Sequence, residues 1–324
     1  MPAVLRLNMT LPGIDPVQLS AMYSAALDMA EFAEANGFMA VTTDEHHGAD
    51  DGWMPATLVF TGMLAARTKT IAVSVQALLL PLHDPLRVAE DLAVLDLASN
   101  GRVAVTLGLG YRPEEYAAHR KDWNRRGQLM DEAVEALLSA WTGEPFDYLG
   151  TRVRVTPVPR TKPHPPVMIG GSARPAARRA ARFGLPFAPP ASLPDLEAYY
   201  LAQCEQRGQP GFVLAPPPDL TLLFVAEDPE RAWAEVGHHL LHEAVTYADW
   251  QTPDIKSSVH SHARTVEDLR SEGLYEILSP QQCRDRAKER GADALVILHP
   301  LCGGMPIEWA WKCLQLYADA TKDL

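Results

Sequence analysis

Short apolar runs alternate along this chain with longer segments that carry apolar residues at helical spacing. Each run reads as a strand and is followed by a predicted helix. The eight runs cover residues 4–9, 38–43, 71–80, 103–109, 167–169, 185–188, 220–226 and 294–298. Eight β/α units in about 250–300 residues are the repeat of a (β/α)8 TIM barrel. A doubly wound open sheet is the main alternative, and the lack of a G-x-G-x-x-G motif after the first run disfavours it.

One segment is too long for an ordinary connection between a strand and a helix. Residues 248–290 precede the last predicted strand, and we interpret them as an inserted lid. Residues 145–155, with Gly150-Thr151 in the middle, read as a small hairpin. Because the sequence shows no linker between domains, we expect a single α/β domain over residues 1–324.

The composition excludes several classes of protein. The formal net charge is −12 with no run rich in Lys and Arg, which argues against a nucleic-acid partner. No stretch approaches 18 apolar residues, so we expect no membrane span. The four cysteines show no C-x-x-C pairing, and the N-terminus lacks the pattern of a signal peptide. We therefore expect a cytoplasmic protein.

Four ionisable residues, Asp44-Glu45-His46-His47, follow the second predicted strand. Active sites of barrels lie at the carboxyl ends of the strands, and a His there can act as a general acid or base. Alternation along the chain would send Glu45 and His47 to one side and His46 to the other. A metal-dependent hydrolase using Asp44, Glu45, His46 and His299 is an alternative, as is a merely solvated loop.

Two further strand ends carry features of a ligand site. Gly108, Gly110, Tyr111 and Arg112 follow the fourth strand, where glycines let a flat ligand approach the backbone and Arg can neutralise an anion. After the fifth strand a helix opens with a glycine-rich segment, and we expect a phosphate to bind there. That segment consists of Gly170, Gly171, Ser172, Ala173 and Arg174.

The substrate pocket is expected to be apolar. Trp53 and Met54 would shape it together with the lid, and His299 after the last strand is a candidate substrate contact. We expect no metal.

Several segments carry a resemblance to a known family. They are Glu45-His46-His47, the block 81–102, the run 107–111, Gly170-Gly171-Ser172 and the tail 295–305. In this order, over nearly the whole chain, they resemble the bacterial luciferase-like flavin monooxygenase superfamily. The resemblance implies a (β/α)8 barrel that binds FMN, or the deazaflavin F420, at its C-terminal mouth.

The resemblance also implies roles for single residues. His46 would face the reactive edge of the flavin and handle protons. Gln76 and Ala77 would join through a non-prolyl cis peptide beside the cofactor. Gly108 stands where the luciferase α subunit has a cysteine near the flavin. Gly171 and Ser172 would hold the phosphate, with Arg112 or Arg174 assisting.

The implied function is that of a two-component monooxygenase. Reduced FMN would come from a separate flavin reductase, and O2 would be used to oxygenate a small-molecule substrate. One alternative is an F420-dependent oxidoreductase that transfers hydride without O2. Another is a non-catalytic flavin-binding protein, against which the intact Glu45-His46-His47 triplet argues. Relatives of this kind pair through outer helices, so we expect a homodimer.

Overall fold

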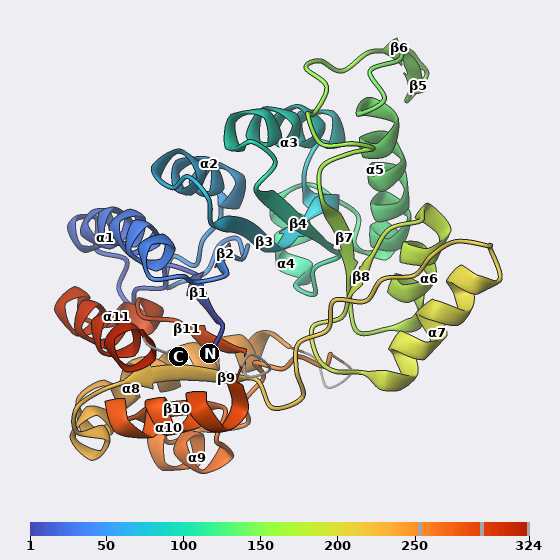
Figure 1. Cartoon of the computed structure of the whole chain (residues 1–324). Helices are drawn as coiled ribbons and strands as arrows, with labels where there is room; N and C mark the ends of the chain where they lie inside the picture. Colours follow the sequence, from blue (N-terminus) through green and yellow to red (C-terminus); the bar gives the residue numbers. More distant parts are fainter. Residues whose placement is uncertain (252–254, 292–294, 323–324) are drawn as a thin grey trace. The chain divides into compact units, whose positions relative to one another are not determined.

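The computed structural model describes residues 1–251, 255–291 and 295–322 (Figure 1). Its strands are mostly parallel and alternate with helices, which confirms the predicted α/β class and βα repeat. The chain divides into two compact units, which we call the first unit (Met1–Pro55 with Pro217–Leu324) and the second unit (Ala56–Pro216). The single domain expected for residues 1–324 stays a prediction.

Among its described residues, the first unit holds five parallel strands in the order β10-β9-β11-β1-β2. These strands are β1 (Ala3–Leu7), β2 (Ala40–Thr43), β9 (Thr221–Val225), β10 (Tyr275–Leu278) and β11 (Val296–Leu298). Its helices are α1 (Pro16–Ala35), α8 (Pro229–Trp250), α9 (Val266–Glu272), α10 (Pro280–Arg290) and α11 (Ile307–Thr321), with a short 3-10 turn, η4 (Cys302–Gly304).

The second unit holds four parallel strands in the order β3-β4-β7-β8 and the predicted hairpin. The strands are β3 (Ala72–Leu79), β4 (Val103–Gly108), β7 (Val167–Gly170) and β8 (Phe187–Ala188), and the hairpin is formed by β5 (Phe146–Tyr148) and β6 (Thr151–Val153). Its helices are α2 (Thr57–Arg67), α3 (Pro85–Ser99), α4 (Pro113–Ala118), α5 (Arg126–Ala140), α6 (Arg174–Phe183) and α7 (Pro194–Glu205), with 3-10 turns η1 (Leu80–Leu82) and η2 (Trp123–Arg125).

The register of the strands brings their carboxyl ends to one edge within each unit. In the first unit Leu7 pairs with Thr43, and Leu5 pairs with Leu298. In the second unit Leu79 pairs with Gly108, and Gly170 pairs with Ala188. The residues that follow these strands therefore meet at that edge, as the strand-end argument requires.

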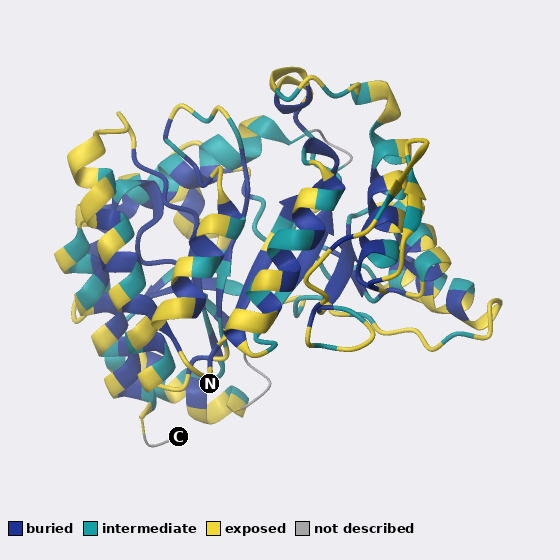
Figure 2. Cartoon of the chain, turned by 90° about the horizontal axis from the view of Figure 1, so that it is seen from above, coloured by how far each residue is buried: buried dark blue, intermediate teal, exposed yellow. Residues whose placement is uncertain are grey.

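Helices bury one face and expose the other, as their colours in Figure 2 show. In α1 the buried positions recur at spacings of three and four, as the sequence predicted, and include Met22, Ala26, Met29 and Ala33. None of the described helices is long and apolar enough to span a membrane.

The expected lid is smaller than residues 248–290. Helix α8 continues to Trp250, and residues 275–290 form β10 and α10 of the regular repeat. Strand β10 pairs in parallel with β9. Sequence reasoning missed this strand, although a capping box of Ser279 with Gln282 marks the start of α10. What is left of the lid is the connection from Gln251 to α9, of which residues 252–254 lie outside the described residues. Its role as a lid stays a prediction.

Candidate active site

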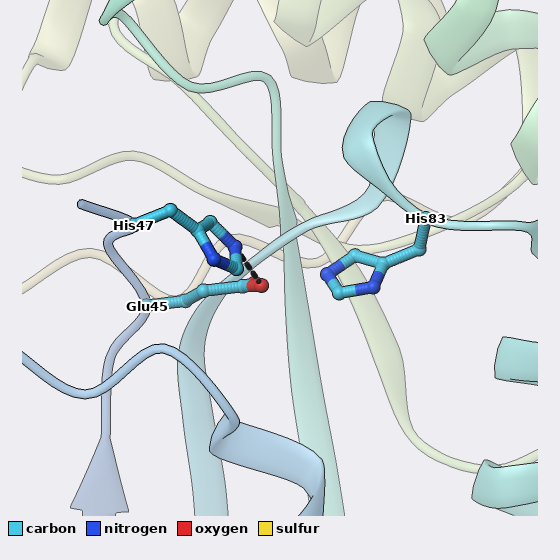
Figure 3. Close-up of side chains that lie close together, drawn as sticks. All are labelled: Glu45, His47 and His83. Carbon is cyan, nitrogen blue, oxygen red and sulfur yellow. Dashed lines mark hydrogen bonds and ion pairs between the residues drawn. The ribbon is translucent and has the colours of Figure 1, made fainter. Parts of the chain in front are cut away.

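The Glu45-His46-His47 triplet follows β2 in the first unit, as predicted. Glu45 and His46 are buried, with 2% and 5% of their surface exposed. Nε2 of His47 lies 2.8 Å from a carboxylate oxygen of Glu45 (Figure 3). This contact fits the expected alternation, in which Glu45 and His47 share one side. A buried carboxylate beside an imidazole is an acid–base pair whose orientation is fixed.

His46 lies among aromatic rings. Its ring centroid is 5.3 Å from that of Trp53, in an edge-on arrangement, and 4.8 Å from that of Trp250. The backbone amide of His46 donates to the carbonyl of Met54 at 3.1 Å, and the Met54 amide donates to the carbonyl of Asn8 at 2.9 Å. The loop that carries His46 is therefore tied to the end of β1.

Arg6 joins two buried carboxylates. Its Nη2 and Nε donate to Oδ2 of Asp44 at 2.7 and 3.0 Å, and its Nη1 donates to Glu243 at 3.0 Å. Burial disfavours the charged guanidinium, yet the two carboxylates outweigh this and raise the pKa of Arg6. A charge in an apolar strand is tolerated only with such partners.

Glu243 and His299 extend this buried network. Nδ1 of His299 lies 2.9 Å from Oε2 of Glu243, and its Nε2 lies 2.9 Å from Oδ1 of Asn8. Burial alone would raise the pKa of Glu243, but the charges of His299 and Arg6 lower it to about 2. The Glu243 carboxylate is therefore ionised at neutral pH.

The three predicted substrate residues lie deep in the first unit. Trp53 and Met54 are 1% exposed and His299 is fully buried. Nε1 of Trp53 donates to Oδ1 of Asp44 at 2.8 Å, and both ring nitrogens of His299 have protein partners. Contact between these residues and a substrate stays a prediction.

The metal-dependent alternative needs free ligand atoms on Asp44 and His299. Both carboxylate oxygens of Asp44 already accept hydrogen bonds, from Arg6 and Trp53. Glu243, His299 and Cys302 have ligand-type atoms within 4.8 Å of one another. However, Arg6 already balances the charge of the Glu243 carboxylate, so this arrangement favours an ion pair over a metal site.

In the second unit, the ends of β3, β4 and β7 pack closely on one another, and we call these three strand ends the platform. The Gln76–Ala77 peptide is cis, as the resemblance implied. A Cβ on Gly108 would lie 2.9 Å from Cβ of Ala77, and one on Gly170 would lie 2.8 Å from Cγ2 of Thr106. Both glycines are therefore required by close packing. Gly110 has a φ of +76°, which also favours glycine.

Arg112 and Tyr111 follow β4. Arg112 is buried, and its guanidinium lies 3.2 Å from Glu115 and 3.1 Å from Glu114. Two carboxylates thus compensate its charge, which weakens its expected role at a phosphate. Tyr111 is half-buried.

Helix α6 begins at Arg174, directly after the glycine-rich segment. Its N-cap is Ala173, and no side chain caps its first turn. Ser172 therefore does not serve as the N-cap. Gly171 has a φ of +140°, and Arg174 is exposed with its guanidinium 5.0 Å from the ring centroid of Tyr199. An uncapped helix N-terminus beside an Arg is suited to bind an anion.

Sequence reasoning missed several residues of the buried network. The sequence around Arg6 and Asn8 gives little indication of a role. Its one unusual feature is the charge of Arg6 inside an apolar strand. Glu243, Tyr247 and Trp250 recur at i, i+4 and i+7 on α8, which places them on one face. That spacing is visible in the sequence, but the partners of these residues are not. Arg6 and Glu243, for example, lie 237 positions apart.

Comparison with known proteins identifies the family of the chain. The family model of the luciferase-like monooxygenases matches residues 9–296. A luciferase-like monooxygenase of Escherichia coli (strain K12) is 34% identical over 170 residues, 51% of this chain and 49% of that protein. The chain thus spans about half the length of the curated relatives it matches first.

Solved structures share the fold over the whole chain. The monooxygenase RslO1 from Streptomyces bottropensis is 23% identical with a TM-score of 0.75, covering 100% of this chain and 99% of that one. The oxygenating constituent of 3,6-diketocamphane monooxygenase from Pseudomonas putida, in complex with FMN, is 17% identical with a TM-score of 0.70, covering 99% and 98%. An F420-dependent secondary alcohol dehydrogenase is 16% identical with a TM-score of 0.63, covering 99% and 98%. The match over residues 9–296 shows that the chain belongs to the luciferase-like monooxygenase family.

Proposed function

We propose that this protein is a flavin-dependent monooxygenase that uses reduced FMN from a separate reductase, and O2, to oxygenate a small organic substrate. The observation that carries the proposal is the platform at the ends of β3, β4 and β7. Gly108 and Gly170 carry no side chain and pack directly against Ala77 and Thr106, so these strand ends form a tightly packed edge of small residues on which a flat ring can lie.

The same unit offers a place for one phosphate. The start of α6 has no side-chain cap, and Gly171 and Ser172 lead into it. Pro175 has no N–H and the Ala176 amide donates to the carbonyl of Ala173, so the Arg174 amide is the donor that the first turn offers. The exposed guanidinium of Arg174 adds positive charge. These residues fit the single phosphate of FMN, and they would hold it through backbone N–H groups and the helix dipole.

Reduced FMN, when bound, supplies the electrons with which O2 is activated. His46 takes up or returns a proton at its imidazole as the oxygen is reduced. Glu45 holds the neighbouring His47 imidazole through their 2.8 Å contact. Trp53 and Trp250 surround His46 and keep water away from its ring.

FMN is favoured over F420 because the P. putida neighbour is an oxygenating constituent that holds FMN. The F420-dependent neighbour makes a hydride-transferring oxidoreductase the second candidate. Anaerobic titration of the protein with reduced FMN and with reduced F420 separates them. We expect FMN to bind at least about tenfold tighter, about 1.4 kcal/mol. Tighter binding of F420 would reverse the assignment.

A non-catalytic flavin-binding protein is a third candidate from another class. Such a protein has no need for a buried acid–base group, whereas Glu45 and His46 are both buried here. The His46→Gln variant tests the difference. If it reoxidises bound reduced FMN as the wild type does, His46 has no role in the reaction.

A further inference from the structure

The ring of His46 belongs to a cluster of aromatic side chains in the first unit. Trp53 and Trp250 contact it directly. Trp53 also stacks on Tyr247, with ring centroids 5.9 Å apart, and lies 5.2 Å from Trp250. The position of Trp53 therefore contributes to the orientation of the His46 imidazole.

Trp53 is held by Asp44. Its Nε1 donates to Oδ1 of Asp44 at 2.8 Å, while Oδ2 of the same carboxylate accepts two hydrogen bonds from Arg6. Two charge-assisted hydrogen bonds fix the position of Oδ2, and the third hydrogen bond, at Oδ1, links that fixed carboxylate to Trp53. The Arg6 guanidinium also lies 5.8 Å from the centroid of the Trp53 ring.

One face of α8 completes this arrangement. Glu243 binds the free end of the Arg6 guanidinium at 3.0 Å. Tyr247 and Trp250, four and seven positions further along the helix, pack against Trp53. The same face of α8 therefore binds Arg6 and packs against Trp53, which contacts His46.

We propose that Asp44 and Arg6 are positioning residues for His46 and act on it through Trp53. Neither residue moves a proton itself. Their fixed ion pair sets Trp53, and Trp53 sets the His46 ring in the one orientation in which its nitrogens serve the reaction. The catalytic part of this inference rests on the flavin chemistry proposed above, whereas the structural part does not.

The structural part is tested by NMR of the His46 ring protons, assigned with the His46→Gln variant. Ring currents of Trp53 and Trp250 displace these resonances from those of free histidine. In Asp44→Asn, and in Arg6→Lys, which loses the guanidinium fork, we expect at least half of that displacement to be lost. If one of these two variants fails to fold, the other still tests the proposal.

Asp96→Asn is the matched control. Asp96 is a buried carboxylate of the second unit that accepts hydrogen bonds from the backbone amide and hydroxyl of Thr161. Its loss is expected to lower stability without moving the His46 resonances. Wild-type resonances in both Asp44→Asn and Arg6→Lys would overturn the proposal, as would equal movement in Asp96→Asn.

The catalytic part is tested by stopped-flow reoxidation of protein-bound reduced FMN. We expect Asp44→Asn to change the rate constant about tenfold, since misplacement of a catalytic group costs up to about a hundredfold. The Kd for reduced FMN should stay within twofold, as a positioning role requires. An unchanged rate constant would overturn this part. If the wild type binds no reduced FMN, the proposed function fails, while the NMR result still decides the role of Asp44 and Arg6.

Discussion

Gly108 shows how one missing methyl group can define a site. Its backbone lies so close to Ala77 that a Cβ would overlap the Cβ of that residue. By the resemblance to luciferases, Gly108 stands where the luciferase α subunit has a cysteine near the flavin, so that contact is absent here. The structure adds a reason why no side chain stands there, since Cβ of Ala77 fills the space that it would need.

Gly108→Ala is therefore expected to displace Ala77 and weaken FMN binding at least about tenfold, because misplacing a binding group by about 1 Å costs up to about a hundredfold; overpacking of this kind also lowers stability by roughly 1–3 kcal/mol. Equilibrium titration with FMN measures the effect. Gly127→Ala is the control, since a Cβ there meets only Nη2 of Arg179 at 3.6 Å. Wild-type affinity in Gly108→Ala would show that the platform does not bind the flavin.

Glu243 links the buried network to the pH dependence of stability. Its pKa falls from 4.5 to about 2 in the folded protein. The folded state therefore binds fewer protons than the unfolded state between these values, so stability is present above pH 4.5 and is lost as the pH falls towards 2. That difference corresponds to roughly 3 kcal/mol at neutral pH.

Urea unfolding between pH 7 and pH 3 measures this slope. We expect Glu243→Gln to flatten it, whereas the control Glu235→Gln, on the exposed side of the same helix, should leave it unchanged. A wild-type slope in Glu243→Gln would mean that this carboxylate is not the titrating group.

Single residues at strand ends were readable from the sequence, but their partners were not. Glu45, His46, Gly108 and Gly171 follow strands, and strand ends can be located from apolar runs. The Arg6–Glu243 pair joins residues 237 positions apart, and nothing local in either segment names the other. A charged residue in an apolar strand indicates that it has an oppositely charged partner, but the sequence does not identify that partner.

Helix α6 is the element on which the phosphate assignment depends. Its first turn has no side-chain cap, and Arg174 stands at its start. If the phosphate binds there, FMN should bind tighter than riboflavin, which has the same ring and no phosphate. In Arg174→Ala we expect this preference to shrink several-fold, since a charge at a helix N-terminus contributes about 0.3–1 kcal/mol.

Arg178→Ala is the matched control, because Arg178 is exposed one turn further along the same helix. Parallel titrations of each variant with FMN and riboflavin give the comparison. Equal affinities of the wild type for both ligands would move the phosphate site away from α6.

Elements with strong local signals carry residues that mark both of their ends. Helix α3 covers Pro85–Ser99 because Asp84 caps its first amides, Pro85 suits the first turn and Asn100 ends it in the left-handed conformation. Strand β10 was missed because it is four residues long and is followed by the charge-rich α10. A short strand that pairs only with distant β9 has too few apolar residues to show a period.

At the level of the whole molecule, the expected homodimer has a candidate surface in the second unit. Helices α2 and α3 expose apolar side chains, namely Val59 (68%), Met63 (46%), Val94 (51%) and Leu97 (45%). We propose that a second copy covers them. The double variant Val59→Glu with Leu97→Glu should then be monomeric in sedimentation analysis. Val17→Glu on α1, where Val17 is 78% exposed, is the control. A dimeric double variant would place the interface elsewhere.

The central claim is that this chain binds reduced FMN and directs its reaction with O2. Stopped-flow reoxidation of reduced FMN, with the protein in excess, tests it most directly. We expect the reoxidation rate constant of bound flavin to differ at least about tenfold from that of free flavin, and to change again in His46→Gln by a factor of the order of 10². Reoxidation at the rate of free FMN, with reduced F420 bound instead, would contradict the claim.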